Sequence, residues 1–492
     1  MNEVLFYNDD LKQMEALDIS EEQVRSHIEA FKKGNFYLKL NRPCIVRDGI
    51  ITVPEEQIQE LTLEHKEAAS KGRLLKFVPA SGAASRMFEA LLAFYEHYHD
   101  ITLEEITKRF NEEDKKAQEL LRFTEGIKQF AFFDDLKSAM GRDGFDVEHL
   151  IECGQIMGIM EYLLTGRGLN CANHPKGLLK FHRYAEESRT AVEEHLVEAV
   201  HYVQDAEGVC RLHITVSSEH REQFVHFLEG VKPRHEKQNQ VRFHVDISLQ
   251  QRSTDTIAVD VHNQPLRGKD GTILFRPGGH GTLIENLNKI KGDIVYIKNI
   301  DNVVPDRLKG PAFIWKKVLG GYLVALQKKI FGYLERLSQG REEESFVNEV
   351  LKFAKDILLI MPPRERQLDS VKEKRKFLLE KLNRPLRVCG VVRNAGEPGG
   401  GPFWVEGNDG SLPLQIVESA QVDMASKDQK EIWHLATHFN PVDIVCAVRD
   451  YKGNPFNLKR YVDPDAVFIS RKSKDGRALK ALELPGLWNG AM

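Results

Sequence analysis

Short apolar runs alternate with helical segments along the middle of the chain, and this alternation constrains the fold more than any other feature. The run Leu74–Pro79 leads through a loop of small residues into a segment with apolar residues at helical spacing. A strand at Leu212–Ser218, a helix at Glu219–Glu229 and strands at Val241–Ser248 and Asp293–Ile300 continue the pattern. Strands that alternate with helices predict an α/β fold with a mostly parallel sheet covered on both faces.

The flanking segments differ in character from this core. Residues 1–72 are polar with helical spacing, and we predict an N-terminal helical region there. The core spans 73–305 and holds a charge-rich helical insertion at about 100–170. We predict a further helical region at 306–383 and a β-rich C-terminal part at 384–492 that completes the core.

Composition excludes several classes of protein. The net charge of −4 over 492 residues argues against a dedicated nucleic-acid binder, which carries a strongly basic surface. No apolar run approaches the roughly 18 residues of a membrane-spanning helix, and the N-terminus lacks the apolar stretch of a signal peptide. The six cysteines are scattered without a CxxC pair, which fits a reducing compartment. We therefore expect a cytoplasmic protein without nucleic-acid or membrane partners; its oligomeric state stays open.

The loop after Leu74–Pro79 is the first candidate for chemistry. Ser81, Gly82 and Ala83 are small enough to let backbone N–H groups approach a phosphate at a helix start. Arg86 follows and offers a planar fork of donors to phosphate oxygens. A plain turn between strand and helix with a surface arginine is the alternative.

A lysine in a rigid setting is the second candidate. Pro175 restricts the chain before Lys176, and Gly177 leaves room beside it, so that an ammonium group is aimed at a phosphate. A helix-entry loop with a solvent lysine is the alternative.

Two further segments complete the set. The segment Arg276–Thr282 holds three glycines, which suit a backbone that passes close to a flat base or sugar. In that interpretation Gly279 and His280 would lie beside the nucleotide. A mobile hairpin tip is the alternative. Asp301 and Asn302 follow the predicted strand Asp293–Ile300. A carboxylate at the end of a buried parallel strand suits Mg²⁺ that also binds phosphate oxygens, whereas a simple strand-end turn is the alternative.

The order of the four segments resembles that of the uridine-diphosphate-sugar pyrophosphorylases, nucleotidyltransferases with a GT-A-like core. It resembles more closely a bacterial family of unknown function related to them. The resemblance covers roughly residues 73–305. It implies that Arg86 and Lys176 contact the triphosphate, that Gly278–Gly281 lies near base and sugar, and that Asp301 is the metal ligand.

The resemblance also implies a glutamine that reads the base, either Gln250 or Gln251, of which Gln251 is preferred. This chain departs from the family pattern at three places. Ser81 and Ala84 replace two loop glycines, His280 replaces an asparagine, and the gap between the phosphate loop and Lys176 is longer.

The implied function is the joining of a sugar-1-phosphate to a nucleoside triphosphate, with Mg²⁺ as cofactor and release of pyrophosphate. Two alternatives stay open. One is a catalytically degenerate protein that binds nucleotide-sugars, and the other is a GT-A-type glycosyltransferase. The sugar and the base are not specified by the sequence.

Late segments carry two further expectations. Gly396–Trp404 is rich in glycine and proline, and we predict an irregular lid or clamp beside the sugar. Family members carry a late lysine in a Phe-x-Pro-x-Lys segment, whereas His438–Asp443 has an acid at that place. We therefore expect that lysine in a segment beyond the 492 residues, with Lys472, Lys474 or Lys480 as substitutes.

Overall fold

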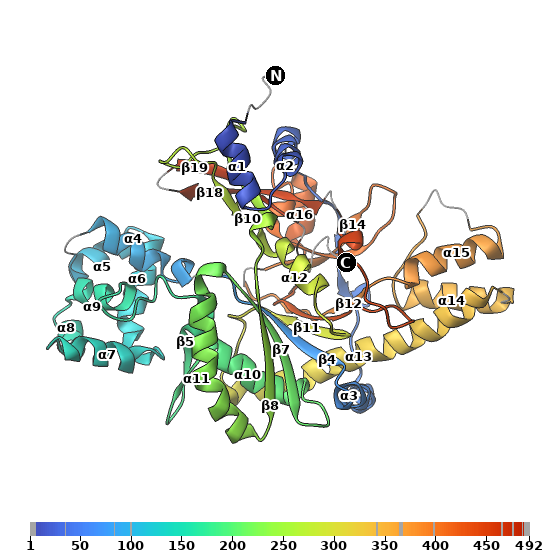
Figure 1. Ribbon diagram of the computed structural model, residues 1–492, viewed down its shortest axis with the longest axis horizontal. Helices are drawn as coiled ribbons and strands as arrows, with labels where there is room; N and C mark the ends of the chain where they lie inside the picture. The colour runs from blue at the N-terminus through green and yellow to red at the C-terminus, as the bar shows by residue number, and fades with distance from the viewer. Residues whose placement is uncertain are drawn as a thin grey trace.

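A six-stranded sheet forms the centre of the computed structural model, which describes residues 6–34, 36–82, 84–98, 101–340, 343–363, 368–396, 399–463, 466–474, 477–484 and 486. The strand order is β12-β17-β11-β4-β7-β8. The strands are β4 (Leu74–Pro79), β7 (Val209–Val216), β8 (Arg242–Leu249), β11 (Ile294–Lys298), β12 (Leu386–Cys389) and β17 (Asp443–Ala447). Strands from both halves of the chain therefore build one sheet (Figure 1).

The sheet is mostly parallel, as the alternation of strands and helices predicts. β11, β4, β7 and β8 pair in parallel, and only β17 runs antiparallel to its neighbours β11 and β12. The carboxyl ends of β4, β7, β8 and β11 therefore meet at one edge of the sheet, which we call the carboxyl edge. The prediction of a mostly parallel α/β core with a β-rich C-terminal part is confirmed.

Side chains of the central strands alternate between two cores. Leu74 and Val78 of β4 pack in the cluster that also holds residues of α3 (Glu55–Ser70), α10 (Ala191–Tyr202), α11 (Arg221–Asn239) and α13 (Asp306–Gln339). Leu75 and Phe77 face the other way, toward α12 (Ile284–Asn288). Helices thus cover both faces, as a buried parallel sheet requires.

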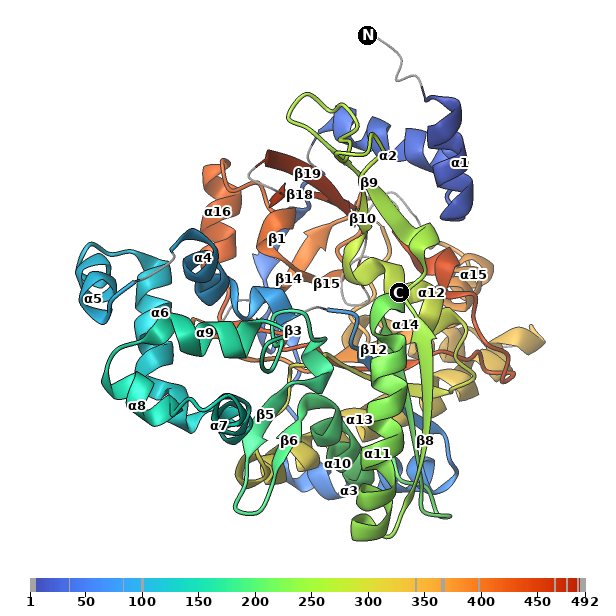
Figure 2. The same cartoon turned by 60° about the vertical axis from the view of Figure 1, so that its left-hand side comes forward.

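The helical insertion forms a lobe at one side of the molecule (Figures 1 and 2). Its helices bury one common apolar cluster that is largely separate from the sheet cores. It comprises α4 (Glu89–His97), α5 (Leu103–Asn111), α6 (Lys115–Gly126), η2 (Ile127–Gln129), α7 (Phe133–Arg142), α8 (Val147–Glu152) and α9 (Ile156–Leu164). Between β4 and β7, the chain also makes η1 (Ala84–Arg86), η3 (Lys176–Leu178), β5 (Lys180–Arg183) and β6 (Ser188–Thr190).

A smaller sheet, β1-β14-β15, corrects two details of the sequence analysis. The N-terminal region is not wholly helical, because β1 (Lys39–Pro43) pairs with β14 (Gly401–Glu406) in the sheet β1-β14-β15. β14 also makes part of Gly396–Trp404 regular, contrary to the expected irregular segment; residues 397 and 398 lie outside the described residues. This sheet also includes β15 (Leu414–Val417). The short strands β2 (Ile45–Val46) and β3 (Gly49–Ile50) follow β1 in the sequence. Long-range strand pairing decides these elements, and local spacing does not reveal it.

The other small sheet has the order β10-β9-β19-β18 and packs against the N-terminal helices. It consists of β9 (Asp255–Val259), β10 (Phe275–Pro277), β18 (Phe468–Lys474) and β19 (Arg477–Glu483), and the helices are α1 (Asn8–Ala16) and α2 (Glu21–Lys33).

α13 continues into a helical region where it shares an apolar cluster with α14 (Glu344–Asp356) and α15 (Val371–Leu382). The remaining short elements are η4 (Ser218–His220), η5 (Arg252–Thr254), η6 (Gly279–Leu283), β13 (Val392–Arg393), η7 (Ser419–Gln421), α16 (Lys427–His434), β16 (His438–Phe439) and η8 (Leu458–Tyr461). Among the described residues, no helix combines the length and apolarity needed to cross a membrane.

Candidate functional site

The carboxyl edge collects the loops in which the sequence analysis places its site residues. The loop after β4 holds Ser81 and Gly82, the loop after β11 holds Asp301, and the turn after β8 holds Gln250 and Gln251. Open α/β sheets bind ligands at this edge because the loops and helix starts there are free to present polar groups. Residues far apart in sequence are therefore neighbours here.

The loop after β4 is joined to the lysine segment by backbone hydrogen bonds. The Lys176 N–H donates to the Gly82 carbonyl at 3.2 Å, and the Ala84 N–H donates to the His174 carbonyl at 3.1 Å. Ser81 and Gly82 are half-buried, whereas residue 83 and the side chain of Arg86 lie outside what the structure describes. The predicted roles of Ala83 and Arg86 therefore stay predictions.

Lys176 and Asp301 form an ion pair. The Lys176 Nζ lies 2.6 Å from the Asp301 Oδ2, although 125 residues separate them in sequence. The lysine side chain is 17% exposed and that of the aspartate 37%. The structure thus brings together two of the three residues, Arg86, Lys176 and Asp301, that the resemblance assigns to phosphate and metal, and the two charges of the pair offset each other.

Gly177 explains how Lys176 comes so close to β11. A Cβ at residue 177 would lie 2.6 Å from Phe224 Cζ and 3.3 Å from Ile300 Cδ1. Only a glycine lets the chain pass between these two side chains without a shift of its neighbours. The Pro-Lys-Gly sequence therefore fits the turn that places the ammonium group beside the end of β11.

The glycine-rich segment also reaches the carboxyl edge. The Gln250 Nε2 donates to the Thr282 Oγ1 at 2.8 Å, which ties η6 to the end of β8. The backbone carbonyl of Gln251 accepts the Thr254 N–H in η5, and its side chain is half-buried. Gln250 is thus the glutamine whose side chain bridges the two segments, while the assignment of Gln251 to the base stays a prediction.

Gly279 has a structural reason to be glycine. Its φ is +77°, and a Cβ there would lie 2.2 Å from the Glu483 Oε2 on β19. The glycine thus lets the backbone pass a neighbouring carboxylate, and His280 beside it is exposed. Contact of Gly279 and His280 with a nucleotide stays a prediction.

Several buried polar atoms near the carboxyl edge have no hydrogen-bond partner among the described residues. They are the Nδ1 of His174, the Oγ1 of Thr215, the Oγ of Ser217 and the Oδ1 of Asn299. All four lie at the end of β7 or in segments that adjoin β4 and β11. Buried polar atoms are nearly always satisfied in folded proteins, so a group of orphans at one edge marks a place where a polar ligand or water completes the bonding.

Beneath this edge, two buried lysines share one glutamate. Lys76 of β4 and Lys298 of β11 contact the two carboxylate oxygens of Glu198 on α10, at 2.8 and 2.7 Å. Burial alone would raise the pKa of Glu198, but the two ammonium groups hold it well below its usual range. Burial lowers the pKa of Lys76 to about 7. The ion pairs of this cluster link the central strands β4 and β11 to α10.

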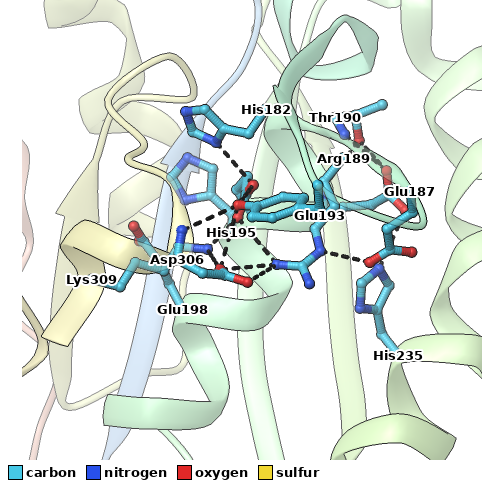
Figure 3. A network of polar contacts seen from close by, with 12 residues as sticks. His182, Glu187, Arg189, Thr190, Glu193, His195, Glu198, His235, Asp306 and Lys309 are labelled. Carbon is cyan, nitrogen blue, oxygen red and sulfur yellow. Dashed lines mark hydrogen bonds and ion pairs between the residues drawn. The ribbon is translucent and has the colours of Figure 1, made fainter. Parts of the chain in front are cut away.

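A wider polar network continues from α10 (Figure 3). Glu194 contacts Lys309 at the start of α13 and accepts hydrogen bonds from Tyr184 and His182 at 2.6 and 2.9 Å. Arg189 of β6 contacts Asp306 at 2.9 Å. These contacts fix the β5–β6 hairpin and the start of α13 against α10.

His195 connects the network to the candidate site. Its Nε2 lies 3.1 Å from the Ile300 carbonyl, and the Lys76 Nζ donates to the His195 carbonyl at 3.1 Å. Burial, followed by the charge of Lys76, keeps the pKa of His195 well below its usual range, so the ring is neutral and donates to Ile300. This hydrogen bond fixes the backbone immediately before Asp301 against α10.

Asp301 fits the role of a Mg²⁺ ligand only together with a bound phosphate. Among the described residues, no group of three or more His, Cys, Asp or Glu side chains is arranged to hold a metal ion. Mg²⁺ commonly binds one or two carboxylates and completes its shell with water and phosphate oxygens. Asp301, with the unpartnered Asn299 Oδ1 two residues before it, supplies hard oxygen atoms of the right kind.

The sequence analysis missed Lys76, Lys298, Glu198 and His195. A signal for the lysines exists, because each is a lone charged residue in an otherwise apolar central strand. A charge in such a strand requires a buried partner. Glu198 and His195 carry no comparable signal, since polar residues on a helix ordinarily face water.

The fold and the edge define an α/β protein with a candidate ligand site at the carboxyl ends of parallel strands. The chain belongs to the family described as Domain of unknown function (DUF4301), whose model matches residues 7–492. This confirms the expected membership of a family of unknown function. No curated protein sequence matches the chain.

Two pyrophosphorylases are among the solved structures that align with this chain. The first is the uridine diphosphate N-acetylglucosamine pyrophosphorylase of Trypanosoma brucei in complex with an inhibitor, at 12% identity and a TM-score of 0.41, covering 98% of this chain and 70% of that one. The second is UDP-glucose pyrophosphorylase of Leishmania major in complex with UDP-glucose, at 10% identity and a TM-score of 0.36, covering 96% and 70%.

Proposed function

We propose that this protein is a nucleotidyltransferase that joins a sugar-1-phosphate to a nucleoside triphosphate and releases pyrophosphate. The observation that carries the proposal is the meeting of Lys176 and Asp301 at the carboxyl edge, 2.6 Å apart. A cation for phosphate and a carboxylate for Mg²⁺ are the two charges that such a reaction needs side by side. The unpartnered polar atoms around them support a polar ligand at the same place.

In this proposal the protein acts by positioning and by neutralising charge. Binding of a triphosphate draws Lys176 away from Asp301 onto phosphate oxygens. Asp301 would then be free to hold Mg²⁺, and a bound Mg²⁺ would offset charge on the phosphates. Gln250 or Gln251 and the segment around Gly279 would contact the base and sugar. The contact of His195 with the Ile300 carbonyl and the bond from Gln250 to Thr282 support these positions.

The second candidate, a nucleotide-sugar-binding protein without catalysis, has its own support. The N–H groups of Ala84 and Lys176 already donate to protein carbonyls, so these backbone donors are not free for a phosphate. Fewer free donors offset less of the charge that develops during the reaction, so this arrangement argues against fast turnover.

Release of pyrophosphate separates the two candidates. The assay mixes the protein with Mg²⁺, uridine triphosphate and glucose-1-phosphate or N-acetylglucosamine-1-phosphate, and follows pyrophosphate with a coupled enzyme. We expect release that falls by about 10²–10³ in Lys176→Met, because one charge-stabilising donor is lost. Lys180→Met is the matched control, since Lys180 pairs with Asp135 at the same 2.6 Å. Nucleotide binding without release in the wild type would instead establish the second candidate.

A further inference from the structure

A second candidate site lies along β12, the edge strand of the central sheet. A cavity of about 1260 Å³ opens there, lined by β12, by α13 and by residues 357–361. It extends from Asp443 at the carboxyl edge to Arg449 beyond the opposite end of β17. The volume is larger than that of most small-molecule pockets.

The walls of this cavity are largely apolar. Leu319, Tyr322 and Leu326 of α13 line one side, and the segment 357–361 lines another. Trp315 and Met361, which also line it, are 51% and 38% exposed. Large apolar side chains that face a shared hollow indicate a ligand with an apolar body.

Charge in the cavity is unbalanced toward the positive. The lining holds five basic side chains and two carboxylates, namely Lys316, Lys381, Arg384, Arg387 and Arg449 against Asp443 and Asp463. Asp443 is paired with Lys316. The Arg449 guanidinium donates to three backbone carbonyls. An anion entering the cavity would therefore meet an excess of positive charge.

Arg384 is a basic residue of the lining with no hydrogen-bonded or charged partner on its guanidinium among the described residues. The guanidinium lies over the Tyr461 ring at 5.5 Å. Arg384 is half-buried, and this burial lowers the pKa of its guanidinium. Next to it, the Asn383 Oδ1 is buried without a hydrogen-bond partner. A half-buried guanidinium without an acceptor and a buried acceptor without a donor each cost free energy, which a polar ligand in the cavity would offset.

We propose that the cavity along β12 binds a small amphiphilic anion, with its acidic head on Arg384 and its apolar body against α13 and the segment 357–361. A carboxylate, sulfonate or phosphate head would accept the fork of donors of the guanidinium. A hydroxyl or amide donor beside the head would satisfy the Asn383 Oδ1. The site does not depend on nucleotide chemistry at Lys176 and Asp301.

Two fluorescent probes with the same aromatic body test the proposal. The anion 1-anilinonaphthalene-8-sulfonate carries a sulfonate, and N-phenyl-1-naphthylamine lacks it. Both are titrated into the 492-residue wild-type chain and into Arg384→Gln, Arg384→Lys and Arg307→Gln. Arg307 is an exposed arginine of α13 outside the cavity lining and controls for net charge. Melting curves establish that each variant unfolds cooperatively.

We expect the sulfonate probe to bind the wild type and to lose about tenfold or more in affinity in Arg384→Gln, since a charge-assisted contact is removed. The neutral probe should bind both proteins equally, and Arg384→Lys should retain most of the sulfonate affinity. Arg307→Gln should behave like the wild type. The proposal is overturned if the wild type does not bind the sulfonate probe, or if Arg384→Gln changes both probes alike.

Discussion

The ion pair between Lys176 and Asp301 should compete with nucleotide binding. In the free protein the lysine is held by the aspartate at 2.6 Å, and a triphosphate must break that contact to reach the ammonium group. Asp301→Asn removes the competing charge while keeping a side chain of the same size. We therefore expect the variant to bind uridine triphosphate more tightly than the wild type when Mg²⁺ is absent.

The size of this gain follows from the exposure of the pair. With side chains 17% and 37% exposed, the pair is partly solvated, and such pairs contribute about 1 kcal/mol or less. One kcal/mol corresponds to about a fivefold change in affinity. Lys176→Met loses the phosphate contact itself, which costs about 1.5–3 kcal/mol.

Isothermal titration calorimetry with uridine triphosphate, in EDTA and in Mg²⁺, measures both effects. Asp301→Asn should gain affinity in EDTA by up to about fivefold and lose the extra affinity that Mg²⁺ gives the wild type. In the double variant with Lys176→Met the gain should vanish, because it acts through the lysine. Weaker binding by Asp301→Asn in EDTA, or an unchanged response to Mg²⁺, would refute the reasoning.

Three further predictions concern packing and buried charge. Gly177→Ala should destabilise the protein by about 1–3 kcal/mol in urea denaturation, because the new Cβ would lie 2.6 Å from a carbon of Phe224; unchanged stability would show that the turn relaxes. Burial raises the pKa of Asp255 to about 6 in the folded state, whereas its pKa in the unfolded chain is near 4. The free energy of unfolding therefore falls as the pH rises from about 4 through 6. Asp255→Asn should therefore stabilise the protein by up to about 3 kcal/mol near pH 8 and by much less near pH 4, and an equal effect at both pH values would contradict the assignment. Glu198→Gln leaves Lys76 and Lys298 without a counter-charge and should lower the free energy of unfolding by about 3–5 kcal/mol at pH 7. Thermal unfolding measures this loss, and an unchanged stability would mean that the cluster is not ionised.

Local sequence patterns predict much of the central sheet. β4 occupies the predicted run Leu74–Pro79, and β7, β8 and β11 lie within two or three residues of the predicted strands. Apolar runs between helical segments are a strong signal because parallel strands are buried on both faces. β1 was missed because its partner β14 lies far along the chain, and pairing of that kind leaves no local trace.

The candidate site was predictable in part for the same reason. Lys176 and Asp301 lie in loops that follow the motif order, and the parallel sheet brings those loops to one edge. The reason for Gly279 was not predictable, because it depends on the approach of Glu483, which lies about 200 residues further along the chain. The support from Glu198 was also not predictable, since only the fold shows that its helix faces two buried lysines. Residues 487–492 lie outside the described residues, and so does the lysine expected beyond them. The side chains of Lys472 and Lys474 are not among those described either.

Hydrogen–deuterium exchange with and without uridine triphosphate and Mg²⁺ tests most directly whether the carboxyl edge is the nucleotide site. The amides of three segments should become protected together, namely 80–84 after β4, 175–178 around Lys176 and 299–302 around Asp301. Peptides from β12 along the second cavity should exchange as before. Protection confined to β12, or no protection at any of the three segments at saturating nucleotide, would contradict the assignment of the site.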